Sequence, residues 1–152
     1  MLNNDETIST LNSLIEISKD GEEGFRKAAE SVNDPQLKTF FLDRSKEVKE
    51  SVFELQELVR DLGGKPAEST SIGGYLHRRW IDLKTAILSN DNLAVLNEVE
   101  RGEDTALNAY VDAANKELPP QVVLVVLRQL TGARRNHDQV KQLREAAELQ
   151  AH

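Results

Sequence analysis

Apolar residues recur at alternating steps of three and four along four long stretches of this chain. This spacing places them on one face of an α-helix. It predicts helices over residues 7–32, 35–62, 92–117 and 120–149. Glycine and proline stop or start these helices in three turns. The turns are Asn33-Asp34-Pro35, Gly63-Gly64-Lys65-Pro66 and Leu118-Pro119-Pro120.

The lengths of the connections predict how the four helices are arranged. Two tight turns make two antiparallel hairpins of helices about 40 Å long. Residues 64–91 join the hairpins, and this connector is itself expected to be mostly helical. Its apolar positions again recur at steps of three and four: Ile72, Leu76, Trp80, Leu83 and Ile87. We therefore predict an all-α chain with a single domain over residues 1–152. Its fold is a ferritin-like antiparallel four-helix bundle, with a long, partly helical crossover between the second and third helices.

Composition excludes several classes of function. The formal charge of −7 argues against nonspecific nucleic-acid binding, which depends on Lys and Arg neutralising phosphates. The chain has no cysteine, so disulfides, thiolate metal sites and cysteine nucleophiles are excluded. The longest apolar run, residues 122–127, is far shorter than the roughly 20 residues that span a bilayer. The amino terminus lacks the features of a secretory signal, so we expect a cytoplasmic protein.

Two acidic clusters interrupt the apolar stripes at matching places. Gly21-Glu22-Glu23 and Gly102-Glu103-Asp104 align within a short internal repeat of residues 15–23 and 96–104. Carboxylates are rarely buried without a partner, so acids at such positions suggest a metal site, a buried ion-pair network or a polar channel.

The turns also predict the height of these acids in the bundle. Counting back from Pro35 places Glu22 level with the segment between Glu47 and Glu50. Counting back from Pro119 places Glu103 level with the segment around Arg135. Polar positions of all four helices are thus predicted to meet at mid-bundle.

A metal site is the first interpretation of this layer. A ferritin-like di-iron site takes one Glu from each of two helices and a Glu-x-x-His pair from each of the other two. Here each pair is half present, as Glu50-x-x-Phe53 and as Arg134-x-x-His137. The candidate ligands for Fe, Mn or Zn are Glu22, Glu50, Glu103 and His137, with Glu47 and Glu100 as alternates.

Two further interpretations stay open. In one, Arg44 and Arg134 neutralise the carboxylates and His137 joins a buried ionic network without metal. In the other, the helices are rotated slightly and most of these acids are solvated.

Several segments together resemble an uncharacterised bacterial family of ferritin-like proteins, over about residues 5 to 147. The segments are Leu14-Ile15-Glu16 with Asp20-Gly21, Leu62-Gly63-Gly64-Lys65-Pro66, Leu76-His77-Arg78-Arg79-Trp80, Glu100-Arg101-Gly102-Glu103-Asp104 and Arg135-Asn136-His137-Asp138. The resemblance implies a bundle of the rubrerythrin and bacterioferritin type and a stress-associated role. It supplies no activity, because Phe53 and Arg134 stand where iron-oxidising relatives complete their two motifs.

These observations lead to two functional hypotheses. The first is a ferritin-like bundle that binds a metal at mid-bundle, with ferroxidase-type oxidation as the enzyme class that the pattern would suggest. The alternative is a metal-free interaction protein, with no cofactor, that acts by oligomerising. A homodimer is expected in either case, since ferritin-like bundles often pair along two helices. Neither nucleic acid nor membrane is an expected partner.

Overall fold

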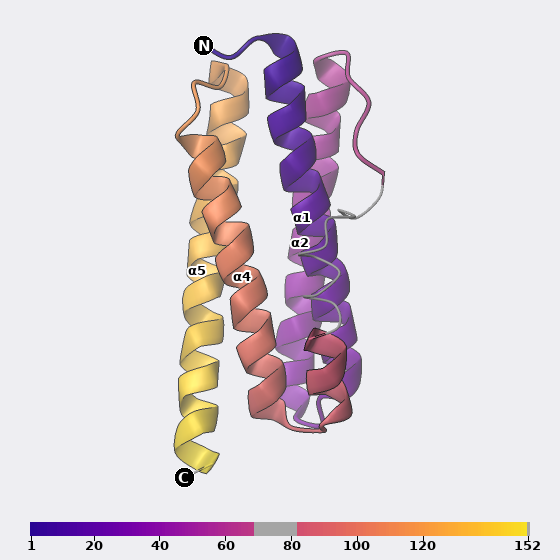
Figure 1. The fold of residues 1–152 in the computed structure, drawn as a ribbon, viewed down its shortest axis with the longest axis vertical. Helices are drawn as coiled ribbons and strands as arrows, with labels where there is room; N and C mark the ends of the chain where they lie inside the picture. The colour runs from indigo at the N-terminus through magenta and orange to yellow at the C-terminus, as the bar shows by residue number, and fades with distance from the viewer. Residues whose placement is uncertain (69–81, 152) are drawn as a thin grey trace.

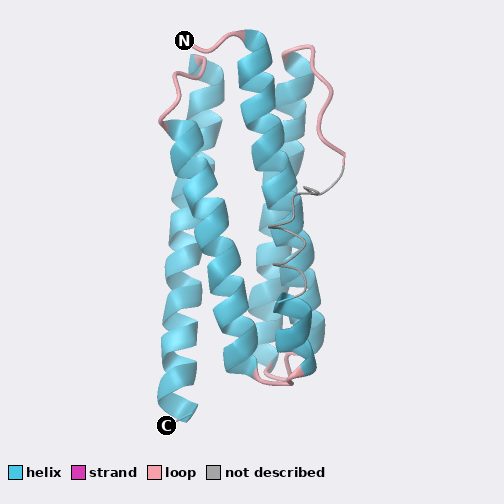
Figure 2. Ribbon diagram, viewed as in Figure 1, coloured by secondary structure: helices cyan, strands magenta, loops and turns pink. Residues whose placement is uncertain are grey.

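The computed structural model of the chain describes residues 1–68 and 82–151. Four long helices make up the fold (Figure 1). They are α1 (Asn4–Ser31), α2 (Pro35–Asp61), α4 (Asn92–Ala114) and α5 (Pro120–Ala151). Each end lies within three residues of the predicted one. Figure 2 shows helices joined by loops, with no strand in the described segments.

Local capping explains where the helices begin and end. The Asn3 side chain accepts a hydrogen bond from the backbone N–H of Glu6 at 2.8 Å, which starts α1 earlier than its apolar stripe predicts. The Asp34 side chain caps α2 in the same way. Gly63 has a φ of 82° just beyond α2, a conformation in which glycine carries no penalty from a Cβ atom.

The chain path makes every pair of neighbouring helices antiparallel. The hairpins α1–α2 and α4–α5 stand side by side, and the connector takes the chain from one end of the bundle to the other (Figure 1). Residues 82–88 of the connector are helical, while the predicted positions Ile72, Leu76, His77 and Trp80 lie outside the described residues. The predicted ferritin-like four-helix architecture is confirmed. In the part of the chain that the structure covers, no helix has the length and apolar character needed to cross a membrane.

The apolar core is divided into two clusters along the bundle axis, and each draws on all four helices. The upper cluster consists of Leu11, Leu14, Ile15, Val52, Leu55, Val59, Tyr110, Ala113, Leu118, Val122 and Val126. The lower cluster consists of Phe25, Ala28, Ala29, Val32, Leu37, Phe41, Ala86, Val95, Leu96, Val99 and Val140. The polar side chains of the middle turns lie between them.

Candidate functional site

A cavity of about 1200 Å³ opens between the two hairpins at mid-bundle. Side chains from all four helices line it, and Leu83 of the connector adds an apolar contact. Its wall is mixed: apolar side chains such as Val48 and Val99 alternate with charged ones such as Arg44 and Glu103. A large concave space with a few converging polar groups is the usual form of a ligand site.

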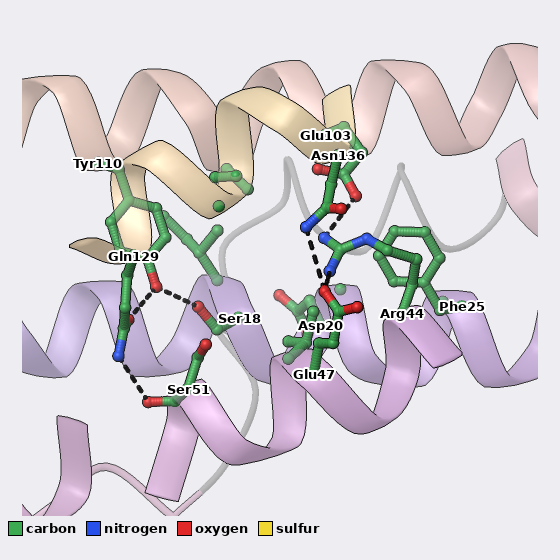
Figure 3. A pocket seen from close by; sticks show the side chains of 18 of the residues that line it. Ser18, Asp20, Phe25, Arg44, Glu47, Ser51, Glu103, Tyr110, Gln129 and Asn136 are labelled. Atoms are coloured by element: carbon green, nitrogen blue, oxygen red, sulfur yellow. Dashed lines mark hydrogen bonds and ion pairs between the residues drawn. The ribbon is translucent and has the colours of Figure 1, made fainter. Parts of the chain in front are cut away.

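A buried ion pair crosses this cavity wall. We call its residues the Arg44 layer: Phe25, Arg44, Glu47, Glu103 and Asn136. Arg44 donates to Glu103 of α4 at 3.0 Å and to Glu47 at 2.8 Å, and Asn136 of α5 donates to Glu47 at 3.3 Å (Figure 3). The guanidinium carbon lies 5.1 Å from the centre of the Phe25 ring, within cation–π range.

Burial sets the electrostatics of the pair. The side chains of Arg44 and Glu103 are only 7% and 4% exposed. Burial raises the pKa of Glu103 above its ordinary value of 4.5, and the charge and hydrogen bond of Arg44 offset this only in part. The Nε atom of Arg44 is buried and has no hydrogen-bond partner. The pair is therefore costly to separate, and one of its donors remains unused.

A second set of polar side chains lies above the pair. We call it the Tyr110 layer: Ser18, Ser51, Glu54, Tyr110 and Gln129. The Tyr110 hydroxyl donates to Gln129 Oε1 at 2.7 Å and lies 3.4 Å from Ser18 Oγ (Figure 3). Gln129 Nε2 donates onward to the Ser51 carbonyl at 3.3 Å and to Glu54 at 2.8 Å. One chain of hydrogen bonds thus joins all four helices.

One hydroxyl and one carboxyl group of this layer have shifted pKa values. Burial raises the pKa of the Tyr110 hydroxyl, so it stays a neutral donor. Burial also tends to raise the pKa of Glu54, but hydrogen bonds from Arg128 and Gln129 and the Arg128 charge lower it on balance. Glu54 is therefore held as a carboxylate beside a neutral phenol.

The residues of the two layers occupy matching positions on the helices, two turns apart. To each layer α2 contributes two residues and the other three helices contribute one each. Matching residues of the two layers lie seven positions apart, which is two turns or about 10 Å. The five pairs are Ser18 and Phe25, Arg44 and Ser51, Glu47 and Glu54, Glu103 and Tyr110, and Gln129 and Asn136.

Glycines widen the cavity between the layers. Gly21, Gly24, Gly102 and Gly132 all line it from helix interiors. A Cβ added at Gly21 would meet no atom within 4 Å, and one at Gly132 would meet its first neighbour at 3.9 Å. Close packing therefore does not require glycine at these two positions. Each glycine nevertheless lowers the stability of its helix by about 1 kcal/mol relative to alanine.

The predicted metal ligands lie at mid-bundle height but engage different partners. Glu103 and Glu47 bind Arg44, and Glu100 pairs with Arg144. His137 bonds through Nε2 to Asp104. Glu50 lines the cavity and is exposed. Glu22 accepts a hydrogen bond from Ser45 at its backbone carbonyl, at 3.2 Å.

These side chains do not gather around one point. Among residues 1–68 and 82–150, no three His, Asp or Glu side chains lie close enough to hold one metal ion. Glu47, Glu100 and Glu103 meet guanidinium groups instead, and Arg44 takes the role that the second sequence interpretation expected of it. Arg134, expected to act likewise, is exposed and enters no ion pair within the described residues. The arrangement does not fit a di-metal centre, and metal binding stays a prediction.

Two central residues, Gln129 and Asn136, were not among the site residues predicted from the sequence. Both are buried, whereas His137, the candidate ligand predicted on this helix, is only partly buried. A heptad from Val122 through Gln129 and Asn136 was the signal that could have found them.

Comparison with known proteins places the chain in a family. A family described as a domain of unknown function (DUF2383) matches residues 6–116. The chain belongs to this family. No curated protein matches it. A solved two-domain protein from Anabaena variabilis, with DJ-1/ThiJ/PfpI-like and ferritin-like domains, aligns with 95% of the chain at a TM-score of 0.76 and 13% identity. The chain spans 37% of that protein, and the likeness shows the ferritin-like fold.

Proposed function

We propose that this DUF2383 chain is a binding protein that holds a small polar molecule in its mid-bundle cavity. The observation that carries the proposal is the Arg44–Glu103 ion pair, which is buried in the wall of a cavity of about 1200 Å³. A packed apolar layer at the same height would cost less than two desolvated charges. A charged wall around a large space is what the recognition of a polar ligand requires.

The glycines support the same conclusion. Gly21 and Gly132 lower helix stability, and no close neighbour prevents a larger residue at either position. Their effect is to leave space next to the Arg44 layer. A bundle that served only as a scaffold would gain stability from alanine at both positions.

Cosolvent mapping by NMR tests whether small molecules enter the cavity. Titration with isopropanol should shift the amide signals of Gly21, Gly102 and Gly132 more than those of surface residues. The variant Gly21→Leu should abolish these shifts, because its side chain extends into the cavity. The matched variant Ser9→Leu, at an exposed position of the same helix, should retain them. Shifts spread evenly over the surface, or unchanged in Gly21→Leu, would contradict the proposal.

A divalent metal ion is the second candidate ligand. Glu47 and Glu103 come from different helices and both bind Arg44, so an ion that displaced this guanidinium would meet two carboxylates. Elemental analysis of protein grown with added iron and manganese tests this candidate. Equal metal content in the wild type and in the Glu47→Gln/Glu103→Gln variant would exclude a site on these two carboxylates. The Glu22→Ala/His137→Ala variant tests the ligands predicted from the sequence in the same way.

A further inference from the structure

We propose that small molecules enter the mid-bundle cavity through a window between α2 and α5. This inference rests on the proposed binding function and specifies the route by which a ligand reaches the site. Three features lead to it: the exposure of the residues that line the cavity, two polar crossings between these helices, and a glycine that lies between the crossings.

The exposed part of the cavity wall belongs almost entirely to α2 and α5. Glu23 of α1 is exposed, but no described residue of α4 that lines the cavity is. The other exposed lining residues lie on α2 and α5: Glu47, Glu50, Arg128, Thr131 and Arg135. Residues that line the cavity and also contact solvent mark the place where the cavity reaches the surface.

Two sets of polar contacts cross between α2 and α5 and frame the window. The upper crossing is made at Glu54, which pairs with Arg128 and accepts a hydrogen bond from Gln129 Nε2 at 2.8 Å. The lower crossing is the hydrogen bond from Asn136 to Glu47 at 3.3 Å (Figure 3). The crossings are two turns apart on each helix, which is about 10 Å. Within the described residues the backbones of these two helices make little contact, whereas those of α1 and α4 come close together.

Gly132 of α5 lies between the two crossings and leaves the window without a side chain at that point. It lines the cavity, and a Cβ added to it would meet its first neighbour, the Arg135 guanidinium, at 3.9 Å. On the facing helix this level holds Glu50, which is exposed and also lines the cavity. A long side chain at position 132 would therefore fill the window that glycine keeps clear.

The ion pair at the upper edge of the window opens at little cost. The side chains of Arg128 and Glu54 are 63% and 36% exposed. Such exposed pairs add little to stability and are weakened by salt. We therefore expect this pair to separate, and the window to widen, without unfolding of the bundle. The Arg101–Glu98 pair is a matched comparison, because Glu98 also lines the cavity but both residues lie on α4, so the pair spans no opening.

The absence of cysteine from the chain makes a thiol reporter of entry possible. The reporter is Ser18→Cys, at a buried position of the cavity wall, and its reaction with iodoacetamide is followed by mass spectrometry. Ala28→Cys is buried in the lower core cluster outside the cavity wall, so it reports reaction through unfolding. An open route to the cavity should make Ser18→Cys react at least about tenfold faster than Ala28→Cys, whose exposure requires global opening.

Two matched comparisons in the Ser18→Cys background locate the entrance. Gly132→Leu should slow the reaction about fivefold, because the filled window leaves local opening of the bundle as the route. Thr105→Leu places the same side chain on the α4 wall of the cavity and should leave the rate unchanged. Arg128→Ala should speed the reaction about threefold, since it removes an exposed pair that spans the opening. Arg101→Ala removes a pair of similar exposure within one helix and should have no effect.

The leucine variants and the core reporter decide whether the window is the entrance. Equal slowing in Gly132→Leu and Thr105→Leu would overturn the inference, because filling any part of the cavity would then have the same effect. A Ser18→Cys thiol that reacts no faster than Ala28→Cys would overturn it as well, since no open route would exist.

The remaining outcomes separate the entrance from the proposed function. Equal rates in Arg128→Ala and Arg101→Ala would overturn the role of the ion pair at the upper edge. If isopropanol shifts the cavity signals while Gly132→Leu leaves the thiol rate unchanged, the entrance is wrong and the binding function stands. If Gly132→Leu alone slows the reaction and isopropanol shifts no cavity signal, the entrance stands and the binding function is wrong.

Discussion

Replacing Arg44 with methionine should destabilise the protein mainly by leaving Glu103 buried without its cation. Methionine retains most of the apolar stem of arginine, so packing changes little. The Glu103 side chain is 4% exposed, and its carboxylate would then have to take up a proton. From an ordinary pKa of 4.5, protonation at pH 7 costs about 3.4 kcal/mol, at about 1.4 kcal/mol per unit. This is the upper limit of the difference from the wild type, in which the pKa of Glu103 is already raised. At pH 5 the same reasoning gives about 0.7 kcal/mol.

Urea unfolding followed by circular dichroism measures this cost. The double variant Arg44→Met/Glu103→Leu should recover to within about 1–2 kcal/mol of the wild type, since an apolar pair can replace a buried ion pair. The control is the pair Arg60 and Glu57 of α2, which has a short contact of 2.6 Å but is about half exposed. Its double-mutant cycle should give a coupling below about 1 kcal/mol. The reasoning would be refuted if Arg44→Met lost the same free energy of unfolding at pH 5 and pH 7. It would also be refuted if the coupling energy between Arg44 and Glu103 were no larger than that between Arg60 and Glu57.

Three further predictions follow from the same geometry. Gly21→Ala should raise the free energy of unfolding by about 0.5–1 kcal/mol. Gly64→Ala should lower it by about 1–3 kcal/mol, because the new Cβ would lie 2.7 Å from Ile8 Cδ1. Equal effects of the two variants in urea unfolding would contradict this. Because the folded pKa of Glu103 is raised, its contribution is fully present below pH 4.5 and is lost as the pH rises toward the folded value. The stability of wild type minus that of Glu103→Gln should therefore fall from pH 4.5 upward, and parallel pH profiles would argue against a raised pKa. Tyr110→Phe should cost about 1–3 kcal/mol, since it leaves a buried amide oxygen without its donor; a thermal midpoint within a degree of wild type would disprove it.

The sequence allowed the helices and their order to be predicted because their signals are local. Apolar residues at steps of three and four determine which stretches are helical, and capping residues such as Asp34 determine where they begin. The mid-bundle height of the polar residues was also predictable, because in an antiparallel hairpin the distance from the turn sets the level. Ser45 of α2 donates to the backbone carbonyl of Glu22, and His137 of α5 bonds to Asp104, the neighbour of Glu103, so both partners lie close to the predicted levels.

Which polar side chains meet was decided by the tertiary structure. One position along a helix corresponds to a rotation of about 100°, so the same apolar pattern on α5 is consistent with an inward His137 or an inward Asn136. In the folded bundle Asn136 faces α2 and donates to Glu47, while His137 lies beside Asp104 of α4. The cavity likewise depends on how far apart the two hairpins stand. Local periodicity therefore determined the bundle, while long-range packing determined the ion pairs and the space that they surround.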